Sequence, residues 1–302
     1  MLSWLAFSFN NTLLISSSRI GVSRSLAALV SNASPAKFTR GVFGYVLKSR
    51  AVMLVCRFRV MVPALMFHSI AGMSVMQPTM FLSHGSPMTA LMDTPAQHFL
   101  SGLAAFVPER PKAILVVSAH WETSAPMLNA VVQNTTLHDF YGFPQPLYQL
   151  HYTPPGAPAL AADIAKLLQS AGYMPELDTA RGLDHGAWVP LLLAYPAADI
   201  PVLQLSVQTA LGPQYHYRLG EALAGLRELG VLILGSGSFT HDLRRFRPGK
   251  TSLDSPETPD VTAFSDWMDE KLQAHDVAAL VDYRKLAPHA ADEHPTEEHL
   301  LP

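Results

Sequence analysis

The feature that most constrains the fold is an apolar run, Ala113–Val117, which continues through Ser118 and Ala119 to His120. A continuous apolar run of this length is typical of a strand that is buried on both faces of a parallel sheet. Open α/β sheets bind their ligands at the carboxyl edge of such strands. The run therefore predicts that His120 lies at a ligand-binding edge.

Two other stretches repeat this arrangement. Thr79–Ser83 is a short apolar strand that leads into His84, and Val231–Gly235 is followed by a Gly-Ser turn and His241. A single histidine is more often a packing residue than a ligand, but parallel strand ends meet at one edge and can bring several side chains together. Neutral imidazole is a common ligand of catalytic metals, so His84, His120 and His241 are candidate metal ligands. A fourth histidine, His185, lies in a glycine-flanked loop from which its side chain could reach the same edge.

Strands and helices alternate along the chain from Met76 onward. This alternation predicts one α/β domain whose central sheet, largely parallel or mixed, is flanked by helices. We expect strands at 79–83, 113–119, 127–132, 201–207 and 231–235, and helices at 95–106, 158–171, 215–229 and 259–275.

Residues 1–75 differ from the rest because they contain no Asp or Glu and are rich in Ser, Arg and short apolar runs. This is the composition of a transit peptide, and the alternative is non-native upstream sequence before a start at Met73 or Met76. Arg57, Arg59 and Pro63 interrupt the apolar segment 51–75, so no clean span of about 20 residues crosses a membrane. We therefore expect an N-terminal extension at 1–75, no membrane partner and a folded domain at 76–302.

Charge and cysteine content narrow the choice of partner and compartment. All 24 acidic side chains but only 13 of the 21 basic ones lie beyond residue 92, and such an acidic body argues against nucleic acid. The single cysteine, Cys56, excludes an intrachain disulfide and a cysteine metal cluster. We expect a cytoplasmic protein, with organelle targeting by residues 1–75 as the alternative.

The sequence around Ser236 matches neither a nucleotide-binding motif nor a hydrolase motif in full. Gly235-Ser236-Gly237 lacks the third glycine of a dinucleotide loop, and Leu234 stands where a G-x-S-x-G elbow around Ser236 needs glycine.

Seven blocks nevertheless resemble a known family in order and spacing, across about residues 76–302. They resemble the class III extradiol ring-cleavage dioxygenases, of the 4,5-DOPA dioxygenase type. The blocks are FLSHGSPM (81–88), VVSAHWET (116–123), LHDFYGFP (137–144), GLDHGAWVPL (182–191), QLSVQ (204–208), SGSFTHDLR (236–244) and HPTEEHLLP (294–302).

The resemblance implies a non-haem Fe(II) enzyme that opens a catechol ring beside its two hydroxyls with O₂, and similar proteins bind zinc when isolated. By position, His84, His120 and His241 match the metal ligands. His185 matches the acid–base histidine and is a candidate fourth ligand, with Asp184 as a neighbour that could orient it. The family continues through a further helix and strand beyond Pro302, so we expect the domain to be truncated at its C-terminus.

The aromatic loop 136–144 provides ring faces and His138, which suit an aromatic substrate with polar edges. We predict substrate contacts for His138 and Phe143, and ordinary aromatic packing is the alternative for Phe140 and Phe143.

Two other functions use the same residues. The site could hold zinc that activates water for hydrolysis, or the scaffold could be a non-catalytic binding protein. The sequence leaves open which catechol is bound, which ring bond is cleaved, the native metal and the oligomeric state.

Overall fold

The centre of the fold is a six-stranded mixed sheet in the order β4-β9-β5-β8-β6-β7. The computed structural model describes residues 5–9, 12–16, 53–54, 75–245 and 255–302. All strand pairs of this sheet are parallel except β6 with β8. The α/β prediction with a mixed sheet is therefore confirmed. The strands are β4 (Thr79–Ser83), β5 (Ala113–Glu122), β6 (Met127–Asn129), β7 (Glu176–Asp178), β8 (Val202–Val207) and β9 (Val231–Gly237).

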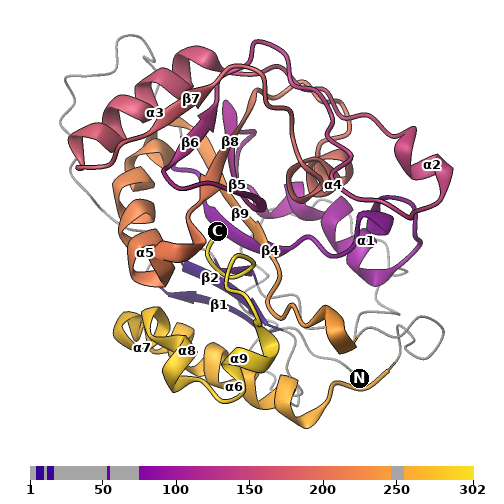
Figure 1. The fold of residues 1–302 in the computed structure, drawn as a ribbon, viewed down its shortest axis with the longest axis vertical. Coiled ribbons are helices and arrows are strands. Elements are labelled where there is room, and N and C mark those ends of the chain that lie inside the picture. Colours follow the sequence, from indigo (N-terminus) through magenta and orange to yellow (C-terminus); the bar gives the residue numbers. More distant parts are fainter. Residues whose placement is uncertain (1–4, 10–11, 17–52, 55–74, 246–254) are drawn as a thin grey trace, which may run out of the picture.

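Successive side chains of a strand point to opposite faces, and each face of this sheet has its own core. Ile114 and Val116 of β5 pack on one face with Trp188 of α4 (His185–Ala194), and α1 (Pro95–Ser101) adds to this face. Leu115 packs on the other face, which α3 (Pro158–Ser170) and α5 (Gly212–Leu223) cover. Figure 1 shows these two helix layers on opposite sides of the sheet. Because helices cover both faces of the sheet, the sequence of β5 is apolar at consecutive positions.

Several elements differ at their ends from the prediction. Strand β5 extends through Glu122, so His120 lies inside the strand rather than after it. The predicted helix 95–106 ends at Ser101 and is followed by a 3-10 turn, and helix 215–229 begins earlier, at Gly212, and finishes as a 3-10 turn. The 3-10 turns are η2 (Pro87–Ala90), η3 (Leu103–Phe106), η4 (Thr209–Leu211), η5 (Ala224–Leu229) and η6 (Leu243–Arg245).

The C-terminal part packs beside the edge strand β4. Its helices enclose a third apolar cluster that contains Phe239, Phe264 and Tyr283. The sequence analysis missed most of these helices because they are only four or five residues long. The helices are α6 (Pro259–Gln273), α7 (Val277–Val281), α8 (Tyr283–Leu286) and α9 (Ala290–Glu293), and the short α2 (Gln145–Tyr148) lies in the aromatic loop region.

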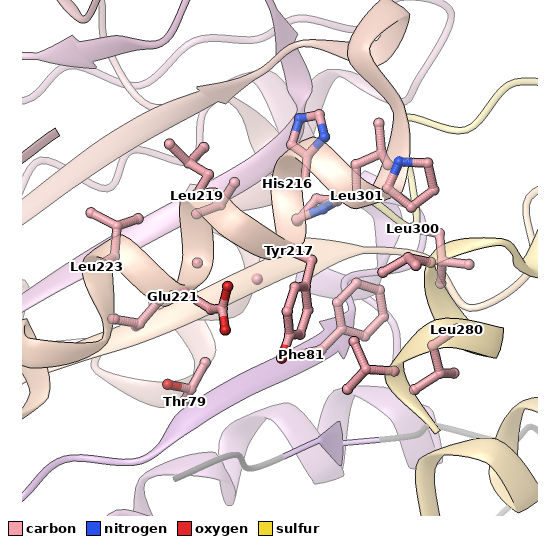
Figure 2. Close-up of a pocket in the computed structure, with 18 of the residues that line it drawn as sticks. Thr79, Phe81, His216, Tyr217, Leu219, Glu221, Leu223, Leu280, Leu300 and Leu301 are labelled. Atoms are coloured by element: carbon pink, nitrogen blue, oxygen red, sulfur yellow. The ribbon is translucent and has the colours of Figure 1, made fainter. Parts of the chain in front are cut away.

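A cavity of about 350 Å³ lies between α5, α7 and the last residues of the chain. Figure 2 shows Leu219, Leu223, Leu280, Leu300 and Leu301 around it, so its walls are mainly apolar. None of the candidate site histidines lines this cavity.

The N-terminal residues that the structure describes form a separate three-stranded antiparallel sheet of β1 (Leu5–Phe9), β2 (Thr12–Ser16) and β3 (Met53–Leu54). The rest of residues 1–74, which makes up most of the predicted N-terminal extension, lies outside the described residues. In the described part of the chain, every helix is too short or too polar to cross a bilayer.

We predict that a chain beginning at Met76 keeps the fold. The three apolar clusters of the described residues draw all of their side chains from Met80 onward, so the deletion removes none of them. The melting temperature, followed by circular dichroism, should change by less than about 4 °C, the shift that ~1 kcal/mol causes in a domain of this size. Loss of the cooperative transition would show that residues 1–75 belong to the core.

Candidate metal centre and active site

Because side chains alternate between the two faces of a strand, four polar side chains lie on one face of the sheet. His84 continues the alternation of Met80 and Leu82, and Ser118 and His120 continue that of Ile114 and Val116. Ser236 does the same beyond Leu232 and Leu234 in β9. Strand order β4-β9-β5 brings the three strand ends together under the first turn of α4. The site therefore forms where the apolar face of each of these three strands ends in polar residues.

His84 and His120 face each other through their Nε2 atoms, which are 2.9 Å apart. Two imidazole nitrogens that bind one metal at about 2.1 Å and at right angles lie about 3.0 Å apart. The pair thus has the separation that two ligands of one metal require.

The hydrogen-bond partner of Nδ1 determines the tautomer of His84. Its Nδ1 lies 3.0 Å from the Ser236 hydroxyl, and that hydroxyl donates its own hydrogen to the Gly186 carbonyl. The Ser236 oxygen must therefore accept from Nδ1 of His84. The Nε2 lone pair of His84 is left free, which is the form that binds a metal.

His185 is the first residue of α4, and its ring centroid is 3.9 Å from that of His120. The Nδ1 of His185 lies 2.9 Å from Oδ2 of Asp139, and its backbone N–H donates to Oδ1 of the same carboxylate. Burial alone would raise the pKa of Asp139, but the hydrogen bonds and charge of His185 outweigh it and lower that pKa. Asp139 therefore fixes the ring of His185 and leaves its Nε2 free.

The expectation that Asp184 orients His185 is wrong, because Asp184 is occupied elsewhere. It caps α4 by accepting from the Ala187 N–H, and it also accepts from Ser118, Arg181 and Gln204. Adjacent residues at a helix start point in different directions, so Asp184 supports the strands below the site and Asp139 takes the orienting role.

His241 lies a few residues beyond the end of β9, and its ring stacks on that of His299 with centroids 3.4 Å apart. Three sets of side chains in the described residues have geometry that could hold a metal. They are His84, His120 and His299; His120, Asp139 and His185; and His241, Glu298 and His299. The structure thus brings His84 and His120 together directly and joins His241 to them through His299.

Burial keeps these imidazoles uncharged. It lowers the pKa of His84 well below its ordinary range, and the neighbouring His120 ring lowers it further. Burial and His185 together lower the pKa of His120 to about 4. Burial also lowers the pKa of His241, although Glu298 and Asp242 oppose the change. Neutral imidazoles that share a buried pocket have lone pairs available for a metal, so these residues fit a metal ion.

The aromatic loop lies beside His185. The Phe140 ring meets the His185 ring edge-on with centroids 5.8 Å apart, and Phe143 packs on Phe140 at 5.2 Å. His138 bonds the Leu150 carbonyl through Nε2 and packs against Trp188. Phe140 is thus the ring of this loop that touches the site, while Phe143 and His138 pack around it.

Comparison with known proteins identifies the family. A family model described as the catalytic LigB subunit of aromatic ring-opening dioxygenase matches residues 78–302. A 4,5-DOPA dioxygenase extradiol of Beta vulgaris is 47% identical over 227 residues, which cover 74% of this chain and 83% of that protein. The protein of the same name from Mirabilis jalapa is 41% identical over 75% of this chain and 84% of its own length.

This chain belongs to the LigB family of ring-opening dioxygenases.

The fold agrees with that membership. A crystal structure of an uncharacterized Escherichia coli K12 protein superposes with a TM-score of 0.60 and 34% sequence identity, covering 74% of this chain and 85% of that one. The chain is accordingly a ring-cleaving dioxygenase of the extradiol class.

Two site residues of this LigB-family chain escaped the sequence analysis. Asp139 and His299 both lie in quoted motifs, LHDFYGFP and HPTEEHLLP, but neither follows a predicted strand. The signal that could have found them is the presence of more than one ionisable residue in each of these motifs. Asp242 and Glu122, the carboxylates nearest to His241 and His120 in sequence, bond instead to Arg244 and to Thr209.

We predict that the metal-free protein loses stability as the pH falls from about 6.5 to 4. His84, His120 and His299 have lowered pKa values when folded, whereas an unfolded histidine titrates near 6.5. The unfolded chain therefore binds more protons in this window, and the free energy of unfolding decreases by ~1.4 kcal/mol per pH unit for each extra proton. Urea titrations between pH 7.5 and 5 measure this slope.

A His120→Leu variant is the control. Because it lacks one titrating imidazole, its free energy of unfolding should change with pH by ~1.4 kcal/mol per pH unit less than that of the unmodified protein. A free energy of unfolding that stays constant or rises as the pH falls from 6.5 to 5 would contradict the assignment of neutral buried imidazoles.

Proposed function

We propose that this chain cleaves the ring of a DOPA-like catechol by extradiol cleavage, with Fe(II) held by His84, His120 and His241, and with O₂ as co-substrate. The relatives named 4,5-DOPA dioxygenase extradiol support the substrate class. The observation that carries the proposal is the pair of neutral imidazole nitrogens 2.9 Å apart, with an Asp139-bound histidine beside it.

A bound Fe(II) would supply the positive charge that favours the deprotonated catechol and the redox chemistry that O₂ requires. With three protein ligands, the site would have room for both the catechol and O₂. His84 is presented with its Nε2 lone pair free because Ser236 occupies its Nδ1. His241, in the loop after β9, would bind from the side of His299, on which its ring stacks, and the Glu298 carboxylate lies 4.0 Å from its Nδ1.

His185 handles the proton of the second catechol hydroxyl. Its Nδ1 donates to the Asp139 carboxylate, so its Nε2 can accept a proton, and the carboxylate then stabilises the imidazolium. Returning that proton to the ring-opened product completes the cycle at the same atom. His185 lies 7% exposed, which limits exchange of this proton with bulk water.

The aromatic loop forms the wall that receives the substrate ring. Phe140 contacts His185 edge-on, and a catechol ring beside it would find an apolar face next to the proton-handling group. We propose that Phe143 and His138 contact the outer part of the substrate, where a DOPA-like side chain would extend.

The direct test is reconstitution of the metal-free protein with Fe(II) under anaerobic conditions, followed by O₂ uptake with a panel of catechols that includes DOPA. We expect one O₂ consumed per catechol and a yellow ring-opened product. Zinc-loaded protein should consume no O₂. Absence of O₂ uptake with every catechol, in protein that holds one Fe(II), would refute the proposal, and metal-dependent hydrolysis by the zinc form would favour a zinc hydrolase.

A second prediction separates proton handling from metal binding. His185→Ala should lower turnover by about 10²–10⁴, the usual range for acid–base catalysis, and keep the bound metal. Asp139→Asn should lower turnover by about 10–100-fold, since outer residues that orient a histidine have effects of that size. Turnover and metal content are measured on the same preparation of each variant.

Glu122→Gln is the matched control, because this carboxylate lies near His120 in sequence but bonds Thr209. It should leave both quantities unchanged. Parallel loss of metal and turnover in His185→Ala would instead make His185 a fourth ligand.

A further inference from the structure

His299 is the buried site residue for which the proposed function has no task. It belongs to the C-terminal segment, residues 294–302, and is 3% exposed. Within the part of the chain that the structure describes, its Nδ1 is buried and has no hydrogen-bond partner. A buried polar atom without a partner is costly and rare, so such an atom inside an active site indicates a contact that a ligand supplies.

Two glycines hold the backbone of His299 over the end of β9. A Cβ at Gly237 would lie 2.0 Å from the His299 carbonyl oxygen, and one at Gly235 would lie 2.8 Å from the Pro302 carbonyl oxygen. The His299 carbonyl also accepts a 2.9 Å hydrogen bond from the Ser238 N–H. The Gly-Ser-Gly sequence, which fails as a nucleotide motif, thus provides the room for this segment to cross the strand.

Apolar contacts anchor the segment after His299. Leu301 is 6% exposed and joins the cluster on the α5 face, while Leu300 packs against the cluster of α6. Figure 2 shows both side chains at the cavity beside α5, which none of the site histidines lines. These contacts fix the main chain at His299, so its ring has a defined place in the site.

The ring of His299 contacts the same pair of rings that His185 contacts. Its centroid is 4.9 Å from that of His120 and 5.4 Å from that of His84, and the His185 centroid is 3.9 Å and 5.4 Å from the same two rings. Stacking on His241 holds its plane. A molecule bound over the His84–His120 pair therefore meets His299 as well as His185.

We propose that His299 is a substrate-binding residue whose imidazole donates a hydrogen bond to a catechol oxygen held at the His84–His120 pair. This inference rests on the proposed function, because it takes the catechol as the ligand of the site. It adds a third histidine, beside His185 and His138, to those that contact the substrate, and it makes the C-terminal segment part of the active site. Direct coordination of the metal is the competing arrangement, since the ligand atom of His299 lies within 4.8 Å of those of His84 and His120.

The test measures binding without turnover. Zinc-loaded protein is titrated anaerobically with 4-nitrocatechol, whose absorbance changes on binding, and zinc content is measured in parallel. His299→Phe keeps the ring and its stacking but has no nitrogen, and it should bind 4-nitrocatechol about 10- to 100-fold more weakly while retaining zinc. His299→Gln, whose amide can donate a hydrogen bond, should recover part of the loss.

His294→Phe is the matched control. His294 is a fully buried histidine of the same segment, but its ring packs against Phe264 and Tyr283 and its Nε2 bonds the Ser238 carbonyl. This variant should bind 4-nitrocatechol as the unmodified protein does. An equal loss in both variants would overturn the proposal, because general packing of the segment would then explain it.

Four other results overturn the inference. Unchanged affinity in His299→Phe would show that the nitrogen makes no contact with the catechol. Loss of zinc in step with loss of 4-nitrocatechol binding would make His299 a metal ligand. If unmodified zinc-loaded protein fails to bind 4-nitrocatechol, this inference fails, while O₂ uptake by the Fe(II) form decides the proposed function separately. Normal catechol cleavage by His299→Phe would likewise refute this inference alone.

Discussion

The facing pair of His84 and His120 is the interaction on which the rest of the site depends. The two buried imidazoles have their Nε2 atoms 2.9 Å apart, so without a metal a single N–H···N hydrogen bond from His120 to the unprotonated Nε2 of His84 joins them. Burial disfavours the protonated forms, as the lowered pKa values of both residues indicate. A metal ion satisfies both nitrogens at once, which explains why a core position can hold such a pair.

The alternation of side chains along each strand and the order of the strands in the sheet bring this pair together. The apolar strands β4, β9 and β5 are neighbours and parallel, so the polar residues that end them meet at one edge. The sequence alone therefore predicts the α/β fold and the meeting of His84 and His120. It also predicts the approach of His185 from its glycine-flanked loop, and in the structure that histidine is the first residue of α4. Periodicity and strand ends are local signals, and these predictions need nothing else.

Other parts of the site depend on contacts that no local pattern contains. Asp139 reaches His185 from 46 positions earlier, and His299 reaches the pair from the end of the chain across two glycines of β9. The choice of Asp139 over the adjacent Asp184 follows from the helix start, where Asp184 caps the chain and binds Ser118. Such pairings depend on how distant loops cross the sheet edge, and a single sequence does not determine them.

The most direct test of this account is the position of the metal. Crystals of the Fe(II)-loaded protein, measured at the iron absorption edge, would give an anomalous difference map. The account predicts one strong peak within about 2.0–2.3 Å of Nε2 of both His84 and His120. A peak bound by other residues, or none at this pair in protein that contains one iron, would contradict it.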